Sequence, residues 1–406
     1  MNILIVTQLY PQPDDIGGNR VTSTVEYFAK EWVADKHNVY IMHCSSKFPF
    51  IVYMIPNKIK KIYSYLTSNI IPSFKSRKFI YREKDGIKIY RLPIFKMFPG
   101  RNFTAKKLRH QSSYIINELK KVNFIPDIVM GHFANPSLEI VANLSNHYKC
   151  MSSIVFHRDC TDKNIVKYRI QENITGIKAV GARSILEAVE VKSKLGLKEI
   201  PFVCYSGIPN EYFLNADSNI NKPPFEKGVN YIFVGSIIKR KHLDKVILAF
   251  SEVSNNQDKL EIIGSGPDDV RMKKLSIKIK SNNIDFIGRL SRAKVLDKMR
   301  QSHIFALISD DETYGMVYIE AMLQGCLVIA SLKGGFDGII VDGYNGFLCK
   351  SGDAKMLKDI FVNINSMTEQ QRRIIQFNAI KTALDFSEKS VSSKYLHEVI
   401  TRNEEI

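Results

Sequence analysis

Short apolar runs alternate with helical periodicity along the first half of the chain. The apolar runs are NILIVT, NVYIMHC, GIKIYRL, DIVMGHF, SSIVFH and IKAVGA. Helices are expected over about 21–33 and 105–121, the second of them amphipathic. Continuous apolar strands separated by such helices are typical of a parallel sheet covered on both faces. This half therefore predicts a doubly wound α/β sheet.

The same alternation restarts near residue 230. The predicted strands are YIFVGS, LEIIGSG, IDFIG, HIFALIS and CLVIAS, and helices run through HLDKVILAFSEV, DDVRMKKLSIKI, RAKVLDKM and GMVYIEAMLQG. A chain of 406 residues is too long for one ordinary core. We predict two doubly wound domains, over 1–205 and 206–385, joined near SGIPNEYF and facing each other across a cleft. Ligands of such sheets bind beyond the carboxyl ends of the strands.

Charge is concentrated in one part of the chain. The formal net charge is +17, and residues 47–109 hold 16 Lys or Arg but only two acids, Glu83 and Asp85. A localised basic field indicates an anionic partner, either an anionic membrane or a nucleic acid. The six cysteines are scattered without a CxxC pair, which indicates buried thiols in a reducing cytosol. We expect neither a secretory signal nor a membrane-spanning segment.

The stretch ETYGMVYIEAM holds two glutamates, Glu312 and Glu320. Gly315 and Gly325 fit the two ends of a helix that is otherwise apolar, so Glu320 is predicted to be buried and to need a partner. The two vicinal hydroxyls of a ribose would suit it, because a carboxylate accepts two hydrogen bonds. The free N–H groups from Tyr314 through Gly315 and Met316 to Val317 form an anion site beside it. An internal salt bridge from Glu320, with a solvated Glu312, is the alternative.

These residues resemble the C-terminal signature of retaining GT-B glycosyltransferases of family 4, S-x-x-E-x-[FY]-G-x-x-x-x-E-A. The resemblance extends to VGSIIKRKHLDKVILAF, LEIIGSGP, IDFIGRLS and GGFDGIIVDGYNGFL. It implies that Lys241 binds the diphosphate, that backbone at Arg289 and Leu290 meets the base, and that Glu312 and Lys241 are catalytic. The donor site would also take in Ser236, Arg240 and Gly264. Two positions depart from the family: Ser236 replaces an arginine, and Gly338 replaces a glutamate.

The N-terminal half resembles the family more loosely. GGNR stands at the place of its glycine-rich loop, so Gly17 and Gly18 would approach a phosphate closely. PDIVMGHFANP resembles PDVVHAHFAYP, which makes His132 an acceptor-side catalytic residue. VFHRDCTD resembles xxHGxD, with Arg158 in place of glycine, and brings in His157 and Asp159. The final helix, over 386–406, would cross back to the first domain as in relatives.

Each candidate also has a simpler interpretation. Lys241 lies in a KRK run of the kind that usually covers a solvated surface, and a lone histidine such as His132 is more often structural. The pair Asp310-Asp311 would suit a hard cation. The family works without metal, however, so we expect no metal and no cofactor.

The resulting hypothesis is a retaining glycosyltransferase that moves a sugar from a nucleotide diphosphate, UDP or GDP, to an acceptor hydroxyl. The acceptor is expected to be a lipid-linked saccharide in bacterial surface polysaccharide synthesis. The protein would be cytoplasmic, and its basic stretch 47–109 would dock on the inner face of the plasma membrane. Two alternatives remain. One is a non-catalytic GT-B partner subunit, and the other is a single-stranded nucleic-acid-binding protein, whose groove interleaves cations with aromatics.

Overall fold

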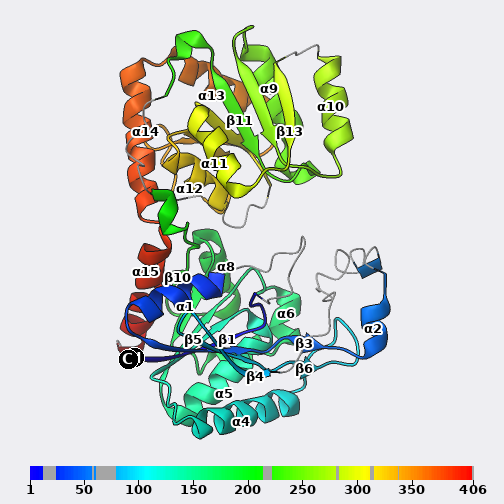
Figure 1. Ribbon diagram of the computed structural model, residues 1–406, viewed down its shortest axis with the longest axis vertical. Helices are drawn as coiled ribbons and strands as arrows, with labels where there is room; N and C mark the ends of the chain where they lie inside the picture. The colour runs from blue at the N-terminus through cyan, green and yellow to red at the C-terminus, as the bar shows by residue number, and fades with distance from the viewer. Residues whose placement is uncertain are drawn as a thin grey trace. The chain divides into compact units, whose positions relative to one another are not determined.

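The computed structural model describes residues 1–11, 24–56, 59–60, 79–213, 222–279, 283–310, 315–336 and 338–404. The chain folds as two compact units (Figure 1). The first comprises residues 1–183, 187–204 and 392–406, and the second comprises residues 184–186 and 205–391. The chain thus enters the second unit at Tyr205 and returns to the first at Ser392.

The first unit is built on an eight-stranded sheet in its described part, in the order β10-β9-β8-β7-β1-β2-β5-β4. All neighbours pair in parallel except β4 and β5, which form an antiparallel edge. A separate small sheet pairs β3 (Ser46–Lys47) with β6 (Ile94–Phe95). The strands of the main sheet are β1 (Asn2–Thr7), β2 (Asn38–His43), β4 (Phe79–Lys84), β5 (Ile87–Arg91), β7 (Ile128–His132), β8 (Met151–Val155), β9 (Ala179–Ala182) and β10 (Phe202–Val203).

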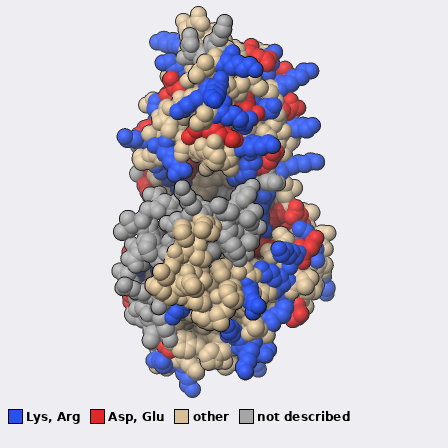
Figure 2. Space-filling view, turned by 90° about the vertical axis from the view of Figure 1, so that its right-hand side faces the viewer, with Lys and Arg blue, Asp and Glu red and all other residues tan. Residues whose placement is uncertain are grey.

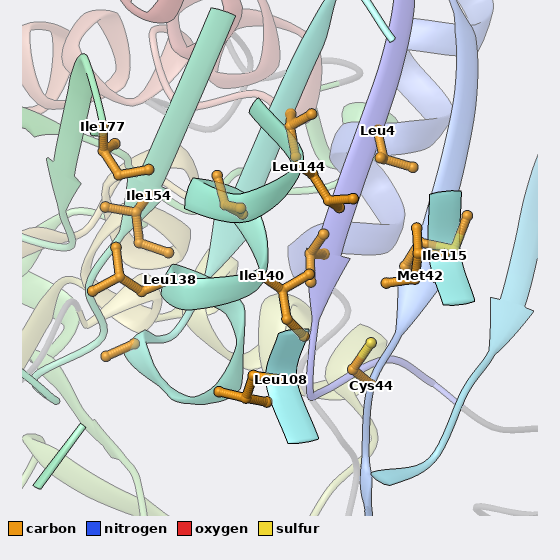
Figure 3. Packing of buried hydrophobic residues seen from close by; sticks show 14 of the residues in the cluster. Leu4, Met42, Cys44, Leu108, Ile115, Leu138, Ile140, Leu144, Ile154 and Ile177 are labelled. Atoms are coloured by element: carbon orange, nitrogen blue, oxygen red, sulfur yellow. The ribbon is translucent and has the colours of Figure 1, made fainter. Parts of the chain in front are cut away.

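Successive residues of a strand point to opposite sides of the sheet, so each of its two faces carries side chains. Helices cover both faces. On one face, Leu4 and Val6 of β1 join a core with α4 and α5 (Figure 3). On the other face, Phe28 of α1 packs against Tyr395 of α15, with ring centroids 5.1 Å apart. The helices are α1 (Thr24–Ala34), α2 (Phe50–Met54), α4 (Ala105–Lys121), α5 (Glu139–Tyr148), α6 (Asp162–Lys167), α7 (Ile170–Ile174) and α8 (Ile185–Leu195), together with the end of α15 (Glu388–Glu404).

Helix α4 shows why the spacing of apolar residues predicted this helix correctly. Its start is fixed by Thr104, whose hydroxyl accepts a hydrogen bond from the backbone N–H of Lys107 at 3.3 Å. Leu108, Ile115 and Leu119 lie on one face and are buried in the core. Burial of each such side chain contributes about 1.5–3 kcal/mol, so this stripe fixes the helix on the sheet.

The second unit is built on a parallel sheet in the order β13-β12-β11-β14-β15-β16. The doubly wound α/β architecture is confirmed for both halves, and β16 is a short strand that the pattern did not reveal. The strands are β11 (Asn230–Val234), β12 (Lys259–Ile263), β13 (Ile284–Gly288), β14 (Ile304–Leu307), β15 (Leu327–Ser331) and β16 (Phe347–Cys349). The helices are α9 (Leu243–Val253), α10 (Asp269–Lys278), α11 (Arg292–Gln301), α12 (Met316–Leu323), α13 (Ala354–Ser366) and α14 (Glu369–Leu384).

Candidate functional site

The loops that follow β13, β12, β11 and β14 lie side by side at the carboxyl edge of the second sheet. Backbone hydrogen bonds join each loop to the next: Gly264 N–H to Gly288 at 2.8 Å, Ile237 N–H to Ser265 at 3.2 Å, and Asp310 N–H to Arg240 at 2.7 Å. Several of the predicted donor residues lie on these loops, among them Arg240, Lys241 and Arg289. The strand order therefore gathers segments that are far apart in the sequence into one continuous edge.

Two glycines allow the loop after β12 to touch the loop after β11. A Cβ atom on Gly264 would lie 1.8 Å from the carbonyl oxygen of Gly235, and one on Gly266 would lie 2.0 Å from that of Ile237. Gly264 also has a φ of +145°, which L side chains rarely adopt. The glycines of GSG thus serve the close approach of two backbones.

The short 3-10 helix Lys239–Lys241 is fixed to the loop after β14. His242 Nε2 lies 2.8 Å from Asp310 Oδ2, and Arg240 Nη1 donates to the Asp310 carbonyl at 3.2 Å. Ser351 Oγ donates to the same carboxylate at 2.5 Å, and this bond is the main reason that the Asp310 pKa lies below its ordinary value. Lys241 is buried. Asp310 is therefore engaged in holding the lysine segment.

Helix α12 begins after Gly315, whose φ is +66°, and this N-cap glycine supplies no side-chain cap to the first turn. Met316 and Val317 in that turn are half-buried, and the remaining residues of the helix are buried. Glu320 is 7 % exposed and pairs with Arg292, the first residue of α11. Burial raises the pKa of Glu320, and the Arg292 guanidinium opposes this rise. The buried charge does have a partner, and the ion pair weighed as the alternative is present. Ribose binding stays a prediction.

The other predicted donor residues are placed as follows. Ser236 and Arg289 are exposed, Leu290 is half-buried, and Arg289 Nε donates to Ser265 Oγ at 2.5 Å. Gly338 has a φ of +85°, which explains why a glycine suits the place where the family has a glutamate. Gly17, Gly18, Glu312 and Tyr314 lie outside the described residues.

The predicted acceptor-side residues meet at the carboxyl edge of the first sheet. His132 ends β7, and its Nδ1 lies 3.1 Å from His157 Nε2. Its Nε2 lies 3.3 Å from the hydroxyl of Tyr395, which comes from α15. His132 is 1 % exposed, and burial lowers its pKa to about 3, so the ring is neutral. Both ring nitrogens are thus engaged by side chains of the same unit. Tyr395 had no signal in the sequence.

Asp159 connects two loops of the first unit. Its carboxylate accepts hydrogen bonds from the backbone N–H groups of Ala134, at 2.5 Å, and His157, at 2.8 Å. Burial raises its pKa. Next to it, Arg158 has a φ of +59°, the conformation for which the family's glycine is suited. Asp159 therefore fixes the backbone around His132 and His157.

No group of three or more His, Cys, Asp or Glu side chains in the described part of the chain is placed to hold a metal ion. Metal independence stays a prediction, since Asp311 and Glu312 fall in the part left undescribed.

The described part of the basic stretch forms an apolar surface on α2 and around β6. We define it by its exposed side chains, which are Phe50, Ile51, Met54, Phe95, Met97 and Phe98, each 43–74 % exposed. Cations border it: Lys107 Nζ lies 5.5 Å from the ring centroid of Phe95, and the Arg101 guanidinium lies 5.9 Å from that of Phe98. This side faces the viewer in Figure 2, where Lys and Arg lie to the right of and below the uncharged surface in the first unit.

Helix α2 is held by a small cluster of its own, in which Val52 packs against Phe48. Tyr53 supports it by accepting a hydrogen bond at its hydroxyl from the backbone N–H of Phe48, at 3.0 Å. Phe50, Ile51 and Met54 therefore remain on the outside. Within the described residues, no helix is long and apolar enough to cross a bilayer.

Comparisons with known proteins agree with this architecture. Residues 216–381 match the family described as glycosyl transferases group 1. An uncharacterized glycosyltransferase of Methanocaldococcus jannaschii, MJ1178, is 27 % identical over 315 residues, covering 75 % of this chain and 82 % of the relative. The putative teichuronic acid biosynthesis glycosyltransferase TuaC of Bacillus subtilis is 23 % identical over 286 residues, covering 68 % of this chain and 69 % of the relative.

Among solved structures, Anabaena Alr3699/HepE in complex with UDP superposes with a TM-score of 0.65 at 15 % identity, covering 99 % of this chain and 100 % of that one. The family match, the relatives and the fold together identify the chain as a glycosyltransferase of the GT-B class. The match to glycosyl transferases group 1 lies within residues 216–381.

Proposed function

We propose that the protein is a retaining glycosyltransferase that uses a nucleotide-diphosphate sugar, with UDP as the first nucleotide to test. The observation that carries the proposal is Glu320, a buried carboxylate near the start of an apolar helix whose N-cap residue is a glycine. UDP in the solved structure of Anabaena HepE supports this choice of nucleotide. The sugar would be transferred to an acceptor hydroxyl on the first unit.

The residues of the second unit suggest how the donor is held. Glu320 would accept the ribose hydroxyls, and the free N–H groups at Met316 and Val317 would face the diphosphate. Lys241 would add a cationic contact, and Glu312 would face the sugar. As the bond to the sugar breaks, negative charge develops on the leaving diphosphate. Fixed N–H dipoles and a lysine aimed at that charge stabilise the transition state more than the ground state.

In this mechanism the leaving diphosphate itself takes the proton of the attacking hydroxyl, on the same face of the sugar. No side-chain base is then required. This fits the first unit, where His132 is buried and neutral and both of its ring nitrogens have partners. We propose that His132 shapes the acceptor side without taking up the proton.

We further propose that the acceptor is a lipid-linked saccharide of a bacterial surface polysaccharide. The similarity to a putative teichuronic acid glycosyltransferase supports the polysaccharide pathway. The apolar surface on α2 and around β6 supports the lipid. Three of its six apolar side chains are phenylalanines, but the other three, Ile51, Met54 and Met97, offer no ring for a base to stack on, so this surface fits a lipid interface better than a nucleic-acid groove. Its bordering cations would face anionic headgroups.

Calorimetric titration with UDP and GDP tests the donor site. Glu320→Gln should bind the preferred nucleotide more weakly by about 1.5–3 kcal/mol, because charge-assisted hydrogen bonds to the ribose are lost. The control is Glu261→Gln, which removes a carboxylate of the same unit that pairs with Lys298 at 2.6 Å. Unchanged affinity in a folded Glu320→Gln protein would remove the ribose assignment. Absence of sugar transfer by a protein that binds nucleotide would instead favour the non-catalytic partner subunit.

Vesicle sedimentation tests the membrane proposal. The protein should sediment with anionic vesicles at low salt and much less with zwitterionic ones. The triple variant Phe50→Ser, Ile51→Ser, Met54→Ser should stay in solution, as should Lys106→Glu with Lys107→Glu. The control is Val270→Ser with Ile277→Ser, which removes two equally exposed apolar side chains from α10. Equal binding to both vesicle types would contradict docking on anionic lipid, and binding to single-stranded RNA alone would favour the nucleic-acid alternative.

A further inference from the structure

Arg292 is the side chain that holds the predicted ribose carboxylate, and the resemblance to the family gave no role to it. It is the first residue of α11, which follows β13, whereas Glu320 lies on α12, which follows β14. One guanidinium nitrogen, Nη2, donates to Glu320 Oε1. The carboxylate side chain is 9 % exposed and the arginine side chain 38 %. The pair thus joins a buried anion to a partly exposed cation at the candidate site.

The guanidinium is held on a second side as well. Its central carbon lies 5.3 Å from the ring centroid of Tyr212, within the range of a cation–π contact. Its Nε is buried and, within the described part of the chain, has no hydrogen-bond partner. The side chain therefore forms neither a bidentate fork with Glu320 nor a fully satisfied network. A single Nη2 contact leaves Glu320 Oε2 without an arginine donor.

The two helices that carry the pair are also joined at their other ends. Lys222 Nζ donates to the carbonyls of Met299, at 3.1 Å, and Arg300, at 2.7 Å, in the last turn of α11. It also donates to the carbonyl of Gln324 at the end of α12, at 2.6 Å. An ammonium group at two helix C-termini is favourable, because it neutralises the negative ends of both helix dipoles. Arg292 and Glu320 therefore stand on two helices that are fixed to each other.

We propose that Arg292 is a positioning residue for the nucleotide: it fixes the direction of the Glu320 carboxylate and leaves Oε2 to accept the ribose hydroxyls. The proposal rests on the ribose role proposed for Glu320. Its physical basis is preorganisation, since a carboxylate that is already oriented loses less conformational freedom on binding. Without Arg292, Glu320 would be a buried carboxylate that has lost the guanidinium paired with it. Burial would then disfavour the ionised form, which is the form that accepts two hydrogen bonds from the ribose hydroxyls.

The test compares two ligands on each variant. One is UDP or GDP, whichever the wild-type protein binds more tightly, and the other is its 2′,3′-dideoxy analogue, which lacks both ribose hydroxyls. The preference is the ratio of the two dissociation constants. Any unfolded fraction of a variant cancels in this ratio, so loss of stability alone does not change it. The variants are Arg292→Gln, Arg292→Lys and Glu320→Gln, with Arg300→Ala as the control on the same helix.

The wild type and Arg300→Ala should prefer the natural nucleotide by about tenfold or more, the size expected for charge-assisted hydrogen bonds. Arg292→Gln should lose most of this preference, with the dideoxy affinity nearly unchanged, and Arg292→Lys should restore part of it. A full preference in Arg292→Gln would show that the ion pair is only structural. A larger preference would show that Arg292 competes with the ribose, and either result overturns the proposal.

Failure of the underlying ribose assignment gives a different pattern. If Glu320 does not bind the ribose, the wild type shows no preference, or Glu320→Gln keeps the wild-type preference. If Glu320 binds the ribose and Arg292 does not position it, Glu320→Gln loses the preference and Arg292→Gln keeps it. The two variants together therefore separate the two claims.

Discussion

The imidazole Nε2 of His132 lies 3.3 Å from the hydroxyl of Tyr395, although the two residues are 263 positions apart. His132 ends a central strand of the first sheet, and Tyr395 belongs to the last helix of the chain. Phe28 packs on both rings, with centroids 6.0 Å from His132 and 5.1 Å from Tyr395. The C-terminal helix thus completes the surroundings of the histidine that the resemblance places on the acceptor side.

This burial predicts a pH dependence of stability. The pKa of His132 is about 3 in the folded chain, because of burial and the nearby Arg183, and is about 6.5 in an unfolded chain. At pH values between these two, the His132 side chain is protonated in the unfolded state and neutral in the folded state. This one group should therefore lower the free energy of unfolding as the pH falls below about 6.5, by about 1.4 kcal/mol per pH unit.

The measurement is the difference in unfolding free energy between the wild type and His132→Gln from pH 7 to pH 5. A difference is needed because burial also lowers the pKa of His43 and His157 and raises those of Asp159 and Glu187, so the wild-type curve combines opposing effects. As the pH falls, the unfolding free energy of the wild type should decrease more than that of His132→Gln. The control is His110→Gln, at an exposed position. Parallel curves for His132→Gln and the wild type would contradict the neutral buried ring.

Gly264 provides a test of the packing between the loops after β11 and β12. Gly264→Ala would place a Cβ atom 1.8 Å from the Gly235 carbonyl oxygen, so one backbone segment must move. Overpacking of this kind costs about 1–3 kcal/mol, and the loop that leads to Lys241 would shift with it. We expect lower thermal stability and weaker nucleotide binding. The control is Gly343→Ala, where φ is +74° but the space is open, so only the conformational cost applies. Equal effects of the two substitutions would argue against the close approach.

The architecture could be predicted because a sheet that is buried on both faces leaves a recognisable pattern of apolar residues in the sequence. Parallel strands such as Ile304–Leu307 are short continuous apolar runs, and α4 carries its buried residues at helical spacing. Edge strands carried less signal. β10 and β16, with two and three residues, are too short to show a period.

The candidate site could be predicted only in part. The burial of Glu320 followed from the apolar helix around it, but its partner Arg292 did not, because a contact between two helices depends on how they pack. The same holds for Tyr395, whose contact with His132 depends on where the last helix returns to the first unit. Residues that act through long-range packing leave no local pattern in the chain.

Lys241 and Glu312 are predicted to affect different steps. Lys241→Ala should weaken diphosphate binding by about tenfold while nucleoside binding changes little, because only the phosphates gain from a cation. Lys239→Ala, at an exposed position in the same short helix, is the matched control. Glu312→Ala should mainly lower turnover and sugar discrimination, since we place Glu312 against the sugar hydroxyls. Calorimetry and initial rates of sugar transfer measure the two effects. Intact transfer by Glu312→Ala would leave only a structural role for that glutamate.

Transfer is predicted to proceed without a divalent metal. The diphosphate leaves with about two negative charges, which must be balanced by metal ions or by the protein. Here the first turn of α12, whose N-cap residue is Gly315, has N–H groups at the positive end of a helix dipole, and Lys241 and the Gly17–Gly18 loop are expected to add positive potential. Initial rates should therefore be the same after treatment with EDTA as after addition of Mg²⁺ or Mn²⁺. EDTA presaturated with Mg²⁺ controls for effects of the chelator itself. A rate that EDTA abolishes and either metal restores would show that the protein alone does not neutralise the leaving group.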